Sequence, residues 1–457
     1  MVRRGQIRNT IVWLGFLLGC LACPNEDQPE EPTPTKTLTA EELRDPKSCQ
    51  ACHQQHYEEW SASMHAYASK DPVFLAMNRR GQRETNGELG SFCVQCHAPM
   101  ALRTGATTDG LNLETLPNHL QGVTCYFCHS VTGVEGTHNN PLTLSEDGVM
   151  RGGIADPVEN VAHLSSYSSL HDRREPESAA VCGSCHDVVT SSGHHLERTF
   201  LEWQQSIYGQ PDRDSFLSCG ECHMNGRTEA VASGAGLPIR RRHQHLMPGV
   251  DVALTPFPGH ANHVAAVQEE LDYALEAHLC MSEEEQLTIK VGNIGAGHSF
   301  PSGAAHDRRV WVEAIAFKAG EEVWSHGVLP VDVPLAQAPD EEPFSFFEHA
   351  FDSNGDDALM FWDAQSSEHN LLVAPSDLNV DSAFADQHQF RVFDLAGLEV
   401  DAIEIKVKMR PMALHVIQSL IDSGDLDPSV RAAIPTFTLK STEVSWTRAD
   451  GFICLPY

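Results

Sequence analysis

Hydrophobic positions divide the chain into four parts with different patterns. Near the N-terminus, a short apolar run at 11–18 follows three arginines. This run is shorter than the roughly 20 residues that a membrane-spanning helix needs, so residues 1–19 are predicted to be an export signal peptide. Residues 20–47 are mostly Glu, Asp, Pro and Thr with almost nothing to bury, which is typical of a disordered Pro/Glu linker.

The last part, 283–457, alternates apolar and polar residues with the period of half-buried strands. Turns rich in Gly, Pro and Asp separate the segments at 287–291, 309–317, 400–409 and 436–446. Between the last two, 410–427 has a helical pattern with Val416, Leu420 and Ile421 on one face. We therefore expect an antiparallel β-sandwich domain over 283–457, of immunoglobulin-like architecture.

Composition narrows the possible partners and directs attention to cysteine and histidine. The 457 residues imply two or more cores, and 31 basic against 63 acidic residues give a formal charge of −32. Such a chain is a poor match for nucleic acid and favours partners with basic docking surfaces. The chain also has 14 Cys and 25 His, both high numbers for this length, so the spacing of these residues carries information about their role.

Five segments in the remaining part, 48–282, share the pattern Cys-x-x-Cys-His, the attachment motif of c-type haem. Two thiols bind the haem covalently and the adjacent His supplies one axial ligand to the iron. Zinc ribbons and disulfides also use Cys-x-x-Cys pairs, but they do not need the His that follows every pair here. We therefore predict five covalently bound haem c groups, held by Cys49, Cys52 and His53; Cys93, Cys96 and His97; Cys125, Cys128 and His129; Cys182, Cys185 and His186; and Cys219, Cys222 and His223.

A low-spin haem needs a second axial ligand, which is most often a histidine in proteins of this kind. His65 lies in a helical-looking stretch soon after the first motif, and His163 and His171 precede the fourth. His245 is close to the fifth motif, and His298 lies in a Gly- and Pro-rich turn of the last domain. These five are the distal candidates, with a hydrogen-bonded or solvated histidine as the alternative for each.

The chain resembles exported multihaem cytochromes related to the tetrahaem cytochrome that takes electrons from hydroxylamine oxidoreductase. Besides the haem motifs, the resemblance rests on Trp60, Ser63 and His65 and on the Glu-Trp-x-x-Ser element within 199–206, and it covers roughly residues 48–250. It implies a mostly helical, loop-rich domain with little sheet and closely packed haems. The expected fold class is thus multidomain α+β, a multihaem cytochrome domain at 48–282 followed by the β domain.

Four cysteines lie outside the haem motifs. The segment 17–20, Leu-Leu-Gly-Cys, resembles the lipobox of bacterial lipoproteins and would make Cys20 the lipidated N-terminus, with Cys23 as a competing site and an ordinary cleaved signal as the alternative. Cys280 and Cys454 could form a disulfide in an oxidising compartment or remain two buried thiols.

These features favour an electron carrier over an enzyme. Closely spaced haems could relay electrons between redox partners in the bacterial periplasm or at the outer membrane. The residue after Cys20 is Leu21, which is not an inner-membrane retention signal, so the outer membrane is the favoured location. The alternative is an oxidoreductase in which one haem keeps an open position for a small nitrogen or sulfur compound. The surplus of histidine and the lack of a Cys-x-x-Cys-Lys motif argue against that alternative. The β domain would dock a partner or stiffen the haem array.

Overall fold

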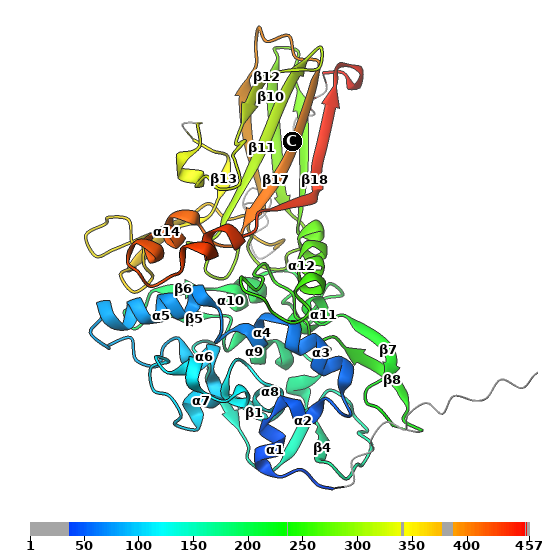
Figure 1. The fold of residues 1–457 in the computed structure, drawn as a ribbon. Coiled ribbons are helices and arrows are strands. Elements are labelled where there is room, and N and C mark those ends of the chain that lie inside the picture. The colour runs from blue at the N-terminus through cyan, green and yellow to red at the C-terminus, as the bar shows by residue number, and fades with distance from the viewer. Residues whose placement is uncertain (1–35, 235, 340–341, 377–386, 453, 455–457) are drawn as a thin grey trace, which may run out of the picture.

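The computed structural model describes residues 36–457 except 235, 340–341, 377–386, 453 and 455–457. It shows a mixed α+β protein in which a helical, loop-rich part adjoins a part made of long strands (Figure 1). The expected signal peptide, Cys20 and most of the linker lie outside the described residues. Among the residues described, no helix is long and apolar enough to cross a membrane.

Short helices and irregular segments form most of the first part. The helices are α1 (Ala40–Arg44), α2 (Pro46–Cys49), α3 (Gln54–Ala62), α4 (Met64–Tyr67), α5 (Pro72–Glu84), α6 (Val94–His97), α7 (Pro99–Arg103), α8 (Cys125–His129), α9 (Glu177–Gly183), α10 (Thr199–Gln205), α11 (Cys219–His223) and α12 (His260–Ala274). Four two-stranded sheets join them: β1 (Val131–Val134) with β2 (Leu142–Leu144), β3 (Val149–Gly152) with β4 (Leu164–Tyr167), β5 (Val188–Val189) with β6 (His195–Glu197), and β7 (Gly226–Ala230) with β8 (Ile239–His243).

Two antiparallel sheets make up most of the second part. One has the order β16 (His388–Asp394), β10 (Gln286–Asn293), β9 (Leu275–Met281), and the other the order β12 (Glu321–His326), β11 (Arg309–Lys318), β17 (Ala402–Arg410), β18 (Phe437–Thr447), with β13 (Ser345–Phe346) also paired to β11. A separate pair is β14 (Glu348–Phe351) with β15 (Ser366–His369). The four segments expected to be strands coincide with β10, β11, β17 and β18, so these predictions are confirmed.

Alternating apolar residues of both sheets meet in one buried cluster, which is the largest core of this part. Leu287, Ile289 and Val291 of β10 face it, as do Val312 of β11 and Ile405 of β17, and all are at most 3% exposed. The immunoglobulin-like topology stays a prediction. Strand β9 joins this core from residue 275, ahead of the expected boundary at 283.

A disulfide links the beginning of this domain to its C-terminal end. Cys280 of β9 is bonded to Cys454 near the C-terminus. The sequence left a disulfide and two free thiols equally open, and the structure has the disulfide. It joins the first strand of the domain to the segment that follows the last.

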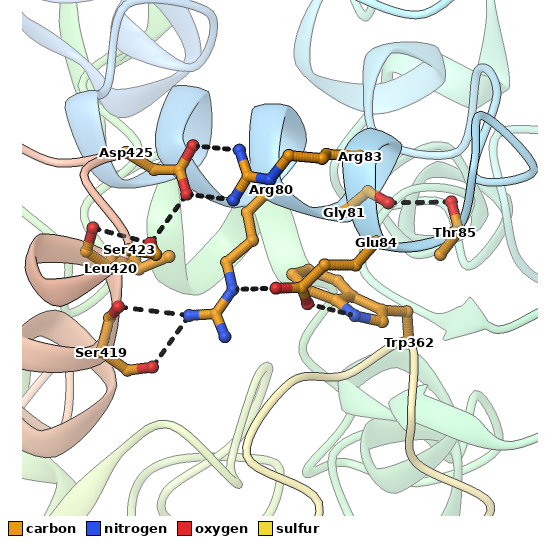
Figure 2. A network of polar contacts seen from close by, with 10 residues as sticks. All are labelled: Arg80, Gly81, Arg83, Glu84, Thr85, Trp362, Ser419, Leu420, Ser423 and Asp425. Carbon is orange, nitrogen blue, oxygen red and sulfur yellow. Dashed lines mark hydrogen bonds and ion pairs between the residues drawn. The ribbon is translucent and has the colours of Figure 1, made fainter.

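Helix α14 (Leu414–Asp422) packs against α5 and so attaches the second part to the first. Val73 and Ala76 of α5 share a buried cluster with Val416, Ile417 and Leu420 of α14, on the apolar face expected from the sequence. Polar contacts surround the cluster (Figure 2): Arg83 pairs with both carboxylate oxygens of Asp425 at 2.6–2.7 Å, Arg80 donates to Ser419, and Trp362 donates to Glu84.

Candidate haem-binding site

Each Cys-x-x-Cys-His motif lies on or beside a short helix, and capping residues fix where two of these helices begin. The Thr124 hydroxyl accepts a hydrogen bond from the Phe127 amide at the start of α8. At the start of α11, Ser218 and Glu221 form a capping box. An N-cap side chain satisfies backbone amides that have no partner within the helix. Each turn therefore presents both thiols and the following imidazole to the same space.

All fifteen motif residues line a single cavity of about 1680 Å³. Its other walls are mostly apolar side chains from α3, α5 and the segments around residues 150–165 and 295–308. The ten motif cysteines are free thiols in the described structure, although several lie in contact with one another. Free thiols in pairs, each followed by an imidazole, are the donor set that covalent haem c requires, so the residues present fit this group.

The motif histidines are held so that one ring nitrogen stays available. Nδ1 contacts a backbone carbonyl in four of them: His53 with Val231 at 2.9 Å, His97 with Ala68 at 3.1 Å, His129 with Arg151 at 2.5 Å, and His223 with Pro248 at 2.7 Å. A nitrogen facing a carbonyl carries the proton, so Nε2 keeps the lone pair. Metal-binding histidines are commonly oriented by this kind of contact.

Four of the motif imidazoles face a second imidazole across the cavity. Two imidazoles on opposite sides of one metal ion have ring centroids about 6.4 Å apart, because a metal–nitrogen bond is about 2.0 Å long. The observed centroid distances are 6.2 Å for His53 and His163, 6.2 Å for His186 and His65, 6.2 Å for His129 and His245, and 6.5 Å for His223 and His298. Each separation matches the space that one iron needs.

Three of the four facing histidines share the same local geometry. Nδ1 of His163, His245 and His298 contacts the carbonyl of Leu164, His243 and Ser299, respectively, at 2.9–3.1 Å. Burial lowers the pKa of His65 to about 3 and the pKa values of His245 and His298 to about 4. These three rings are therefore neutral at pH 7, which is the form that binds a metal.

His171, the fifth distal candidate, is placed differently. Its ring stacks beside that of His129 at 5.7 Å, but its Nε2 contacts the carbonyl of Cys128 at 2.8 Å. Its Nε2 is thus engaged, while its Nδ1 is buried without a hydrogen-bond partner. His245 occupies the position opposite His129 that the sequence could not assign.

His97 differs from the other motif histidines. Phe74 of α5 stacks on its ring at 4.1 Å with an interplanar angle of 6°. Within the described part of the chain, no second imidazole faces His97 at the distance seen for the other four. Phe74 was not singled out by the sequence, because an apolar residue on a helix gives no sign of what it covers.

Contacts between thiols show which motifs are neighbours. Three pairs of thiols from different motifs lie close enough to interact: Cys49 with Cys125, Cys96 with Cys185, and Cys182 with Cys219. Cys128 of the third motif also interacts electrostatically with Cys182 and Cys185 of the fourth. The first, third, fourth and fifth motifs therefore form a continuous series, and the second adjoins the fourth.

A buried ion-pair network holds the segment that carries His245. Arg242 donates to both carboxylate oxygens of Glu59 at 2.7 and 2.8 Å and to Glu229 at 2.5 Å. Glu59 also accepts the backbone amide of His245 at 2.9 Å. The Arg242 side chain is only 1% exposed. Neither Glu59 nor Arg242 was predicted, because the two lie 183 residues apart and no local pattern connects them.

The loop that carries His298 is fixed by α10 of the first part. Glu202 accepts hydrogen bonds from the Ser299 amide at 3.2 Å and the Ser302 hydroxyl at 2.6 Å. The Thr199 hydroxyl contacts that of Ser302 at 2.7 Å. Glu202 belongs to the Glu-Trp-x-x-Ser element, so this part of the resemblance marks the contact between the two domains.

Comparison with known proteins agrees with this site. The family model described as cytochrome c554 and c-prime matches residues 48–130. The fold is similar to the crystal structure of a penta-heme cytochrome c552 from Thermochromatium tepidum, with 18% sequence identity, a TM-score of 0.60, and coverage of 89% of this chain and 99% of that chain. No curated protein matches the chain. The motifs and these similarities support a multihaem c-type cytochrome.

Proposed function

We propose that the protein binds five haem c groups through its five motifs and relays electrons between redox partners in the periplasm or at the outer membrane. The observation that carries this proposal is the single cavity lined by all five motifs, in which thiols of neighbouring motifs lie close enough to interact. Bound haem c supplies one-electron chemistry at its iron. The proposal includes the expected kinship with the tetrahaem partner of hydroxylamine oxidoreductase and an immunoglobulin-like form for the β domain.

In this proposal the chain holds four irons between pairs of histidines. His163, His65, His245 and His298 would supply the second imidazole to the irons held by His53, His186, His129 and His223, respectively. Backbone carbonyls contact the Nδ1 of six of these eight rings. Burial lowers the pKa values of His53, His65, His129, His186, His245 and His298, which favours the neutral imidazole that binds a metal. Apolar walls exclude water from the irons, which tunes how readily each one accepts an electron.

The experiment that tests the relay is electron paramagnetic resonance of the oxidised protein, with optical spectra of the reduced protein before and after carbon monoxide. We expect four low-spin irons whose optical spectra do not change when carbon monoxide is added. A protein with fewer than four such irons would contradict the ligand pairs. Mass spectrometry of the purified protein should give five haems per chain, and any smaller number would contradict the count.

A second candidate function is specific to the His97 motif. Because no imidazole faces His97 among the described residues, an iron held there could keep a position for a small nitrogen or sulfur compound. The same spectra distinguish the two functions. One high-spin iron with a matching carbon monoxide shift would favour an oxidoreductase. Five low-spin irons would exclude the oxidoreductase and favour electron transfer as the function.

The membrane attachment belongs to the proposal as well. A lipid on Cys20 would hold the protein at the outer membrane through the linker that follows it. Mass spectrometry of the mature N-terminal peptide tests this. An unmodified peptide that begins elsewhere would remove the anchor without affecting the electron-transfer proposal.

A further inference from the structure

Four apolar or aromatic side chains gather on the surface where the two domains meet. Tyr273 at the end of α12 is 72% exposed, Ile294 in the loop after β10 is 42% exposed, and Leu217 before α11 is 37% exposed. Tyr208, half-buried, connects them: its hydroxyl donates to the Ile294 carbonyl, and its carbonyl accepts from the Leu217 amide, both at 3.0 Å. We call these four residues the Tyr273 surface.

Hydrogen bonds to backbone atoms bring the segments that carry these residues together across the domain boundary. The Ile294 amide donates to the carbonyl of Ala274, the residue next to Tyr273, at 3.2 Å. Figure 1 shows the C-terminal end of α12 joined to the strands of the second part. Soluble proteins seldom leave several large apolar side chains together on the surface unless the patch binds something.

The surface lies directly over the fifth motif. Leu217 is two residues before Cys219, and both Leu217 and Tyr208 line the same cavity as His223 and His298. Ile294 is in the loop that carries His298. The Tyr273 surface is therefore the exposed side of the His223–His298 pair, at one end of the series of neighbouring motifs.

Acidic side chains border the Tyr273 surface. Glu269 and Glu270 precede Tyr273 by four and three residues, so they lie on the same side of α12. Glu270 interacts electrostatically with His223, and Glu221 lies within the fifth motif. Asp212 and Asp214, on either side of Arg213, are exposed in the loop between Tyr208 and Leu217.

We propose that the Tyr273 surface docks a redox protein whose own cofactor edge is apolar and ringed by lysines, and that electrons pass there through the fifth motif. This inference rests on the proposed electron-transfer function and specifies where one partner binds. An apolar centre with a charged rim is the usual anatomy of a specific interface. Opposite charge at the rim speeds the encounter in a salt-dependent way. A second copy of this chain would bring a second acidic rim, and like charges repel.

The test uses the full haem-loaded protein, reduced, and a lysine-rich monohaem cytochrome c as the probe. Stopped-flow absorbance gives the second-order rate constant for reduction of the probe at several salt concentrations. The test variant combines E269Q with Y273S. The matched control combines E322Q with V392S, because Glu322 is exposed on β12 and Val392, 57% exposed, is on β16, both in the strand domain.

We expect the test variant to react at least tenfold more slowly than the parent at low salt, with a weaker dependence on salt, and the control to stay within twofold of the parent. Haem content and visible spectra of both variants should match those of the parent, since neither variant changes a motif. Equal rates for test variant and parent would overturn the docking surface while leaving the relay intact. A parent protein that cannot reduce the probe at all would remove both.

Discussion

Replacing Arg242 by Leu should destabilise the protein far more than the same replacement two positions earlier at Arg240. The Arg242 side chain is 1% exposed and its partner Glu59 is 16% exposed, so the substitution leaves a buried carboxylate without its cation. Breaking a buried ion pair from one side costs about 3–5 kcal/mol. For a domain of this size, that corresponds to a fall in Tm of roughly 6–20 °C.

Arg240 is the matched control because it sits on the same strand and also pairs with a carboxylate. Its partner Asp156 is 76% exposed, so water replaces the lost contact and Tm should hardly change. Circular dichroism follows unfolding of the haem-loaded proteins, and electron paramagnetic resonance reports the ligands of each iron. Arg242→Leu should also disturb the signal of the iron between His129 and His245, since Glu59 holds the His245 amide. Equal Tm values for the two variants would refute the reasoning.

Three further predictions follow from the same geometry. His245→Ala should convert one low-spin iron to high spin in the paramagnetic resonance spectrum, because His245 faces His129 at the distance that one iron needs. His171→Ala should leave the spectrum unchanged, because the Nε2 of His171 already contacts the Cys128 carbonyl. Identical spectra for the two variants would contradict the assignment. Burial raises the pKa of Glu197 from 4.5 to about 7, so the folded state binds more protons than the unfolded state and Tm should fall as pH rises from about 4.5 to about 7; Glu197→Gln should flatten that fall, and an unchanged slope would contradict it. Replacing Cys280 and Cys454 together by Ser removes their disulfide and should lower the free energy of unfolding by about 2–5 kcal/mol in urea titrations. Reducing the disulfide of the parent protein should lower the free energy of unfolding by a similar amount, and a smaller loss would contradict the prediction.

The parts of the structure that sequence predicted best are those with a local signature. The haem motifs are fixed by spacing alone, and the strands that became β10, β11, β17 and β18 by a two-residue period. Strand β9 was not anticipated, because 275–281 continues from α12 without a turn that would separate the two elements. The short strand pairs of the first domain likewise carry too few residues to show a period.

The proposed distal histidines were harder to pair with motifs, because which histidine faces which motif depends on contacts across long stretches of chain. His65 follows the first motif in sequence but faces His186 of the fourth, 121 residues away. His163 precedes the fourth motif but faces His53 of the first. Proximity in sequence therefore identified histidines that face a motif, but not which motif each one faces. The choice between His171 and His245 likewise depends on the folded geometry.

The strand domain adjoins the cavity in two places, and each place concerns a different motif. Its loop at 293–303 brings His298 opposite His223, and Asn293 holds that loop by donating to the His298 carbonyl at 2.7 Å. Its helix α14 packs on α5, the helix that carries Phe74 against His97. Sites supported by rigid elements keep their geometry better than sites on free loops. The loop contact adjoins the strand core through Phe300, and the α14 contact lies in a separate buried cluster. The second domain therefore helps to set the surroundings of the second and fifth motifs at two independent places.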